Sequence, residues 1–111
     1  MTQNNLGNAY WDLPAGDRAE NLKQAITCYE AALQVYTHEA FPVQWATTQN
    51  NLGTAYSDLP AGDRAANLKQ AIACYQAALQ VFHLAGMDYY LPIVSGNLET
   101  AKDALRNLEE D

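Results

Sequence analysis

An asparagine recurs three times at a fixed spacing of 46 residues, as Asn5, Asn51 and Asn97. A carboxamide carries both hydrogen-bond donors and an acceptor, and an extended peptide backbone presents the same two kinds of group. A row of such amides can therefore hold a peptide main chain without reading its side chains. A second interpretation stays open, in which each asparagine fixes helix geometry or bonds to the neighbouring unit.

These asparagines share a helical face with other residues when the sequence is read at spacings of three and seven. The predicted peptide-binding face consists of Asn5, Asn8 and Asp12, then Thr47, Asn51, Thr54 and Asp58, and finally Asn97 together with Ile93, Thr100 and Ala104. All six Lys and Arg residues fall outside this predicted face, and the whole chain has a net charge of −7. The charges thus predict a neutral or basic peptide as the ligand, and they argue against an acidic tail.

The residue types that serve in catalysis or metal binding occur here without a usable pattern. His38 and His83 do not share a helical face with a carboxylate and a nucleophile. Cys28 and Cys74 match no metal or redox spacing, and we expect both to be small buried residues. The sequence therefore predicts a protein that is not an enzyme and that has no metal and no cofactor.

Length and composition indicate one ordinary folded domain, with 111 residues of which 49% are hydrophobic and 17% charged. The excess of acidic over basic residues argues against nucleic acid as a partner. Apolar runs are far shorter than the roughly 18 residues that suggest a membrane span, and the N-terminus is unlike a signal peptide. We therefore expect a cytoplasmic protein with no membrane association.

An internal repeat organises the chain, because residues 2–35 match residues 48–81 at an offset of 46, with 29 of 34 positions identical. The five differences are Asn8/Thr54, Trp11/Ser57, Glu20/Ala66, Thr27/Ala73 and Glu30/Gln76. A degraded third copy follows, since Asn97, Leu98 and Ala101 lie 46 residues after their counterparts. We divide the chain into a first unit (1–40), a second unit (41–86) and a C-terminal capping segment (87–111).

Each unit is predicted to hold two helices. The second helix of each pair carries an apolar stripe at 3.6-residue spacing, formed by Leu22, Ala25, Ile26, Tyr29, Ala32, Leu33 and Tyr36, and again by Leu68, Ala71, Ile72, Tyr75, Ala78, Leu79 and Phe82. Asp17 and Asp63 follow a Pro-Ala-Gly run and can cap these helices. With a shorter first helix in each unit and a final helix from about Tyr90, the sequence predicts an all-α fold of about five helices.

The first helix of the first unit begins at Thr2, whereas its counterpart begins near Pro42 or Val43. We expect the array to be truncated at its N-terminus and to belong to a longer solenoid. Apolar surface from Leu6 and Tyr10 would then be exposed at that end, which predicts possible homo-oligomers.

The repeated residues resemble the signature of the tetratricopeptide repeat (TPR) family. The matching residues are Leu6, Gly7, Tyr10, Ala25, Tyr29 and Ala32, with their copies Leu52, Gly53, Tyr56, Ala71, Tyr75 and Ala78. The Asn-Asn-Leu-Gly runs are most similar to the longer repeats of kinesin light chains and their bacterial relatives. The resemblance implies a right-handed α–α superhelix whose first helices line a concave face, where asparagines of this family contact bound peptide. The period exceeds the usual 34 residues by 12.

The leading hypothesis is therefore a non-catalytic protein–protein interaction scaffold that binds an extended neutral or basic peptide on its concave face. Two alternatives stay open. The units can act as a structural spacer or self-assembling module, because stacking of exposed repeat ends gives oligomers. They can also be the sensor region of a larger bacterial signalling enzyme.

Overall fold

The computed structural model describes residues 7–8, 11, 17–60 and 62–110 of the 111-residue chain. These residues form helices α2 (Arg18–Val35), α3 (Pro42–Asp58), α4 (Arg64–Leu84) and α5 (Leu91–Glu110), with a short 3-10 helix η1 (Asp88–Tyr90) before α5. Residues 7, 8 and 11 are also helical, and no strand occurs within the described ranges. The all-α prediction is confirmed.

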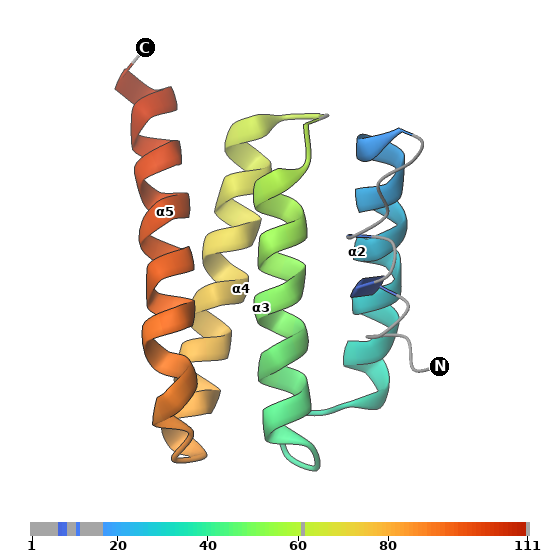
Figure 1. The fold of residues 1–111 in the computed structure, drawn as a ribbon, viewed down its shortest axis with the longest axis vertical. Coiled ribbons are helices and arrows are strands. Elements are labelled where there is room, and N and C mark those ends of the chain that lie inside the picture. The colour runs from blue at the N-terminus through green and yellow to red at the C-terminus, as the bar shows by residue number, and fades with distance from the viewer. Residues whose placement is uncertain (1–6, 9–10, 12–16, 61, 111) are drawn as a thin grey trace.

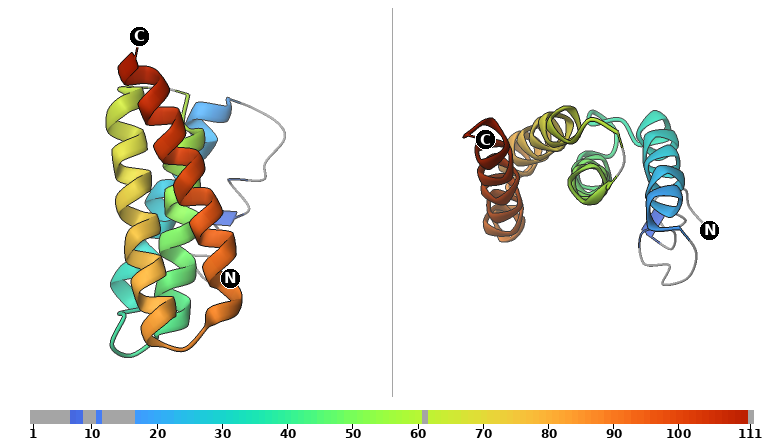
Figure 2. Two further views of the ribbon diagram at one scale, coloured as in Figure 1. Left: turned by 90° about the vertical axis from the view of Figure 1, so that its left-hand side faces the viewer. Right: turned by 90° about the horizontal axis from the view of Figure 1, so that it is seen from above.

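The helices stand side by side with alternating chain direction, in the order α2, α3, α4, α5 (Figure 1). Each helix packs against the next one along the chain, and α3 also contacts α5. Seen from above, α4 lies behind the pair formed by α3 and α5 (Figure 2). Since α5 is the counterpart of α3 in the following copy, this is the arrangement of a helical repeat solenoid, as predicted.

Helix starts follow the predicted capping residues. The Asp17 side chain accepts hydrogen bonds from the backbone N–H groups of Ala19 (2.9 Å) and Glu20 (3.2 Å). Asp63 does the same for Ala66 at 3.1 Å. Such caps satisfy backbone donors that have no partner within the helix. Helix α3 instead begins with Pro42, whose missing N–H and fixed φ suit a first helical position.

The described residues form two apolar core clusters. One lies between α2 and α3 and includes Cys74 of α4, and the other lies among α3, α4 and α5. The predicted stripes of the second helices are largely buried, with Tyr29 and Phe82 as their largest fully buried side chains. In α3, Leu52 is buried, and Trp45 and Tyr56 are half-buried but pack against the core. The buried register of this helix also includes Ala46 and Thr48.

A close approach between the two helices of each unit depends on glycine. A Cβ atom on Gly7 would lie 2.6 Å from the Tyr29 ring, and a Cβ on Gly53 would lie 2.8 Å from the Tyr75 ring. Distances below 3.0 Å are essentially never tolerated. Only glycine fits this approach at Gly7, and the second unit repeats it at Gly53.

Two further expectations concern buried and terminal residues. Cys28 and Cys74 are buried free thiols, as predicted. No helix in the described part of the chain is long and apolar enough to span a bilayer. The surface predicted around Leu6 and Tyr10 lies outside the described residues.

Candidate peptide-binding pockets

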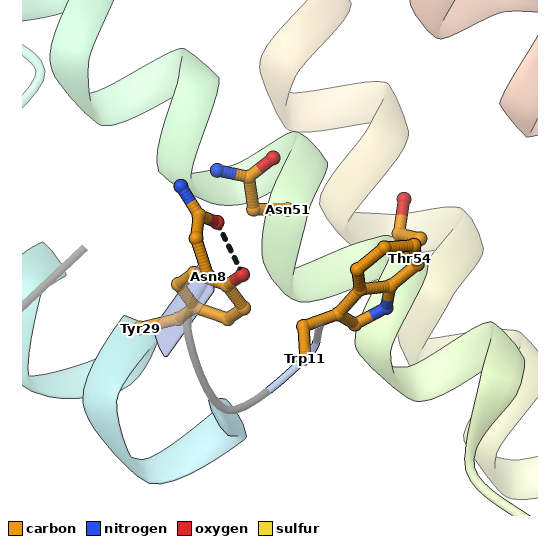
Figure 3. Close-up of a pocket in the computed structure, with 5 residues that line it drawn as sticks. All are labelled: Asn8, Trp11, Tyr29, Asn51 and Thr54. Carbon is orange, nitrogen blue, oxygen red and sulfur yellow. Dashed lines mark hydrogen bonds between the residues drawn. The ribbon is translucent and has the colours of Figure 1, made fainter. Parts of the chain in front are cut away.

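Two pockets open on the surface formed by the first helices. The first pocket has a volume of about 250 Å³ and is lined by Asn8, Trp11, Tyr29, Asn51 and Thr54 (Figure 3). The second has a volume of about 210 Å³ and is lined by Thr54, Ser57, Asp58, Arg64, Leu68, Tyr75, Asn97, Thr100, Ala101 and Ala104. Thr54 belongs to both, so the two pockets are neighbours on this surface.

The two pockets occupy equivalent places in the repeat. Every residue that lines the first pocket has its counterpart, 46 positions later, in the lining of the second: Thr54, Ser57, Tyr75, Asn97 and Thr100. Each pocket therefore lies between one unit and the next, and it draws on the first helix of both. The fold builds the same kind of cavity twice in succession.

In the first pocket, the Tyr29 hydroxyl donates to Asn8 Oδ1 at 2.5 Å, and Asn51 faces this pair from α3 (Figure 3). Trp11 forms another wall, and the Arg18 guanidinium lies over its ring, 5.2 Å from the ring centroid. The Trp11 indole Nε1 is buried and has no hydrogen-bond partner among the described residues. None of the described residues lining this pocket carries a charge.

In the second pocket, the Tyr75 and Thr54 hydroxyls are hydrogen-bonded at 2.9 Å. Thr54 also donates to the Asn50 carbonyl oxygen at 3.1 Å, which fixes its side chain on α3. Burial raises the pKa of the Tyr75 hydroxyl above its ordinary value of 10. This hydroxyl thus stays protonated at neutral pH and acts as a fixed polar group in the pocket wall.

The second pocket corrects the expectation that every cation lies outside the predicted binding face. Arg64 lines this pocket beside Asp58, and its guanidinium donates a hydrogen bond to the Ser57 carbonyl oxygen. The residue spacing along α3 alone does not reveal this cation. Arg64 starts α4, and the turn after α3 brings it back to the same surface.

One of the recurring asparagines bonds to the neighbouring unit. Asn97 Nδ2 on α5 donates to Asn50 Oδ1 on α3 at 3.1 Å. This bond joins the capping segment to the second unit, as the structural interpretation of the asparagines requires. Asn97 also lines the second pocket, so this side chain both bonds to α3 and forms part of the pocket wall.

Comparison of the sequence with models of known protein families identifies the family of this chain. A model of the tetratricopeptide repeat matches residues 1–38 and 45–85, which is more than half of the chain. The chain belongs to the TPR family. No curated protein and no solved structure gave a match in the corresponding comparisons. The finer likeness to kinesin light chains stays a prediction.

The TPR pockets bring together seven of the eleven residues predicted for the binding face: Asn8, Asn51, Thr54, Asp58, Asn97, Thr100 and Ala104. Ile93 is exposed on α5 and lines neither pocket. Thr47 is half-buried on α3 and lines neither pocket. Asn5 and Asp12 lie outside the described residues. That these side chains bind peptide stays a prediction.

Sequence reasoning missed Trp11 and Tyr29 in the first TPR pocket, and Arg64 and Tyr75 in the second. The tyrosines belong to the signature of the second helix and were assigned to the core alone. A signal was nevertheless present. Two of the five differences between the near-identical units, Asn8/Thr54 and Trp11/Ser57, fall within these pockets.

The reactive side chains of this TPR chain have ordinary structural surroundings. Burial raises the pKa of the Cys74 thiol to about 11, so the thiol is neutral and a poor nucleophile near pH 7. His38 pairs with Glu39 at 3.0 Å on the surface and packs edge-on against Trp45. Among the described residues, no group of three or more His, Cys, Asp or Glu side chains could hold a metal ion.

Proposed function

We propose that this TPR chain is a non-catalytic interaction module that holds an extended neutral or basic segment of another protein along its two pockets. TPR repeats generally mediate protein–protein interactions. The observation that carries the proposal is the pair of equivalent, neighbouring pockets lined by residues of the predicted binding face. Two neighbouring cavities on one surface suit an extended ligand better than a compact one.

The polar groups of the pockets suit a peptide backbone. Asn8 offers its amide nitrogen, because its oxygen already accepts from Tyr29. Asn51 and Thr54 line the next stretch of the same surface. Asp58 is exposed at the end of α3 and supplies a negative charge. Together with the net charge of −7, this favours basic over acidic segments, because the field of the whole chain repels anions.

A peptide array that compares neutral, basic and acidic 12-residue sequences tests the proposal. We expect neutral and basic peptides to bind the purified chain and acidic ones to bind least. The Asn51→Ala variant should bind the selected peptides more weakly, with its circular dichroism spectrum unchanged. Gln80→Ala is the matched control, because Gln80 is an exposed residue on α4 that lines neither pocket. Equal binding by both variants, or a preference for acidic peptides, would contradict the proposal.

Self-assembly is the second candidate function, and exposed apolar side chains at one end of the helices favour it. Val35 ends α2, Phe41 precedes α3, Leu84 ends α4 and Tyr89 lies in η1, and their side chains are 67%, 43%, 76% and 78% exposed. These helix ends lie at the same end of the molecule (Figure 1). Light scattering over a concentration series tests this function, and we expect Leu84→Glu to reduce any association. A monomer at all concentrations would exclude self-assembly of this chain.

A further inference from the structure

The two pockets share their architecture but differ in chemistry at one wall. Position 11 of the first unit is a tryptophan, and its counterpart is Ser57. Among the described residues, the indole Nε1 of Trp11 is buried without a hydrogen-bond partner, whereas the Ser57 hydroxyl interacts with the Tyr75 hydroxyl. Leaving a buried polar group unpaired costs free energy, which a ligand group that pairs with it would recover. This wall is therefore a place where the two pockets can select different ligand side chains.

The difference between Trp11 and Ser57 also determines whether an arginine side chain lines the pocket. In both units the arginine seven residues further on donates to the backbone carbonyl of this position, Arg18 to Trp11 and Arg64 to Ser57. The Trp11 ring stands beside the Arg18 guanidinium, and Arg18 does not line the first pocket. Ser57 has no ring, and Arg64 does line the second pocket. The indole thus separates the first pocket from its arginine.

We propose that the two pockets are distinct side-chain subsites for one extended peptide. The first takes a large uncharged side chain, packed on the Trp11 indole. The second takes a basic side chain, which pairs with Asp58. This inference rests on the proposed function and adds the order of ligand side chains to it. The difference between Trp11 and Ser57 sets that order.

The geometry also predicts the spacing of the two side chains along the peptide. Helices α3 and α5, which are equivalent in successive copies, are neighbours joined by the bond between Asn50 and Asn97. Packed helices lie about 8–10 Å apart. An extended chain advances about 3.3–3.6 Å per residue, so one helix spacing corresponds to about three residues. The uncharged and the basic side chain should therefore lie about three positions apart in the ligand.

Charge alone does not decide the second subsite, because Arg64 and Asp58 both line it. The Arg64 guanidinium already donates to the Ser57 carbonyl oxygen. Asp58 is exposed, and the described residues supply no ion pair to its carboxylate. A ligand cation therefore meets an available carboxylate, in a molecule whose net charge is −7. This favours lysine or arginine over glutamate at the second subsite.

Selection from a random 12-residue peptide library displayed on phage tests the inference, with the purified chain as bait. We expect the wild-type chain to enrich an aromatic or large aliphatic residue about three positions from a lysine or arginine. Trp11→Ser should abolish the preference at the uncharged position and weaken the selected synthetic peptide about tenfold or more, as at other tryptophan anchors. Ser57→Trp should replace the preference for a basic residue by one for a large uncharged residue.

Charge variants complete the experiment. Asp58→Asn should weaken the selected peptide about twofold to fivefold, as expected for an exposed ion pair. Asp88→Asn removes the same charge from η1, away from both pockets, and should leave binding unchanged. Circular dichroism checks that each variant is folded. Profiles that stay the same in Trp11→Ser and Ser57→Trp would overturn the two-subsite inference while the proposed function stands. No enrichment by the wild-type chain would overturn both.

Discussion

Replacing Gly53 by alanine tests whether the close packing of the two helices in a TPR unit sets the stability of this fold. The new Cβ would lie 2.8 Å from Cε1 and 3.0 Å from Cδ1 of Tyr75. The ring has little room to move, since Tyr75 is only 2% exposed and its hydroxyl is bonded to Thr54 at 2.9 Å. We therefore expect the helices to be forced apart.

Two opposing effects determine the magnitude. Alanine is favoured over glycine inside a helix by up to about 1 kcal/mol. Overpacking a tight core costs about 1–3 kcal/mol. The free energy of unfolding of Gly53→Ala should thus fall by up to about 2 kcal/mol. The melting temperature should fall by roughly 4–8 °C for each kcal/mol in a domain of about this size.

Gly96→Ala is the matched control, because Gly96 lies in α5 with nothing within 4 Å of its added Cβ. Only the helix propensity acts there, so this variant should gain up to about 1 kcal/mol. The two substitutions are chemically identical and should shift the melting temperature in opposite directions, measured by circular dichroism. A rise in both variants would refute the reasoning, because it would show that the Tyr75 ring yields without cost.

Three further outcomes follow from single contacts. In a double-mutant cycle, Asn50→Ala and Asn97→Ala should show a coupling energy of about 0.5–1.5 kcal/mol in urea unfolding, and strict additivity would exclude the bond as a joint between α3 and α5. Asp63→Ala removes the N-terminal cap of α4 and should lower the free energy of unfolding by about 0.5–2 kcal/mol. An unchanged free energy of unfolding would show that this cap does not stabilise the fold. Burial raises the pKa of the Cys74 thiol from 9.0 to about 11. Between these pH values the thiol ionises in the unfolded chain but not in the folded one. The contribution of the neutral Cys74 thiol to the free energy of unfolding is therefore intact below pH 9 and is lost as the pH rises toward 11. The stability of the wild-type chain should fall by about 1.4 kcal/mol per pH unit more steeply than that of Cys74→Ala in this range, and parallel pH profiles would contradict the assignment.

The fold could be predicted from the sequence wherever the apolar pattern was regular. The second helices carry an unbroken stripe at 3.6-residue spacing, and residues such as Leu22 and Leu68 are buried as that stripe predicts. The first helices were harder to read, because small and polar residues take core positions there. Thr48 is fully buried, and its hydroxyl donates to the Gln44 carbonyl oxygen at 2.8 Å within the same helix. A hydroxyl that is satisfied locally can occupy an apolar position without being recognised in an apolar pattern.

Only those residues of the candidate site that lie on one face of a single helix could be predicted from the sequence. Asn51, Thr54 and Asp58 follow one another on α3, and helical spacing groups them correctly. Tyr75 and Arg64 come from α4, so their presence in the pocket depends on how the turn after α3 returns the chain. Spacing along one helix does not contain that information. The charge of the pocket was therefore predicted less well than its polarity.

Because the two units are nearly identical, the few positions at which they differ indicate where their functions can differ. Positions that hold the helices together, such as Gly7 and Gly53 against their tyrosines, are unchanged between the units, because the same contact must form in each. The difference between Trp11 and Ser57 changes a pocket wall instead, and there the first unit adds the packing of the indole against the core cluster. When two repeat units keep the same helix-packing contacts but differ in a pocket wall, their pockets can contact different ligand groups. The pockets are accordingly where we expect selectivity between partners to reside.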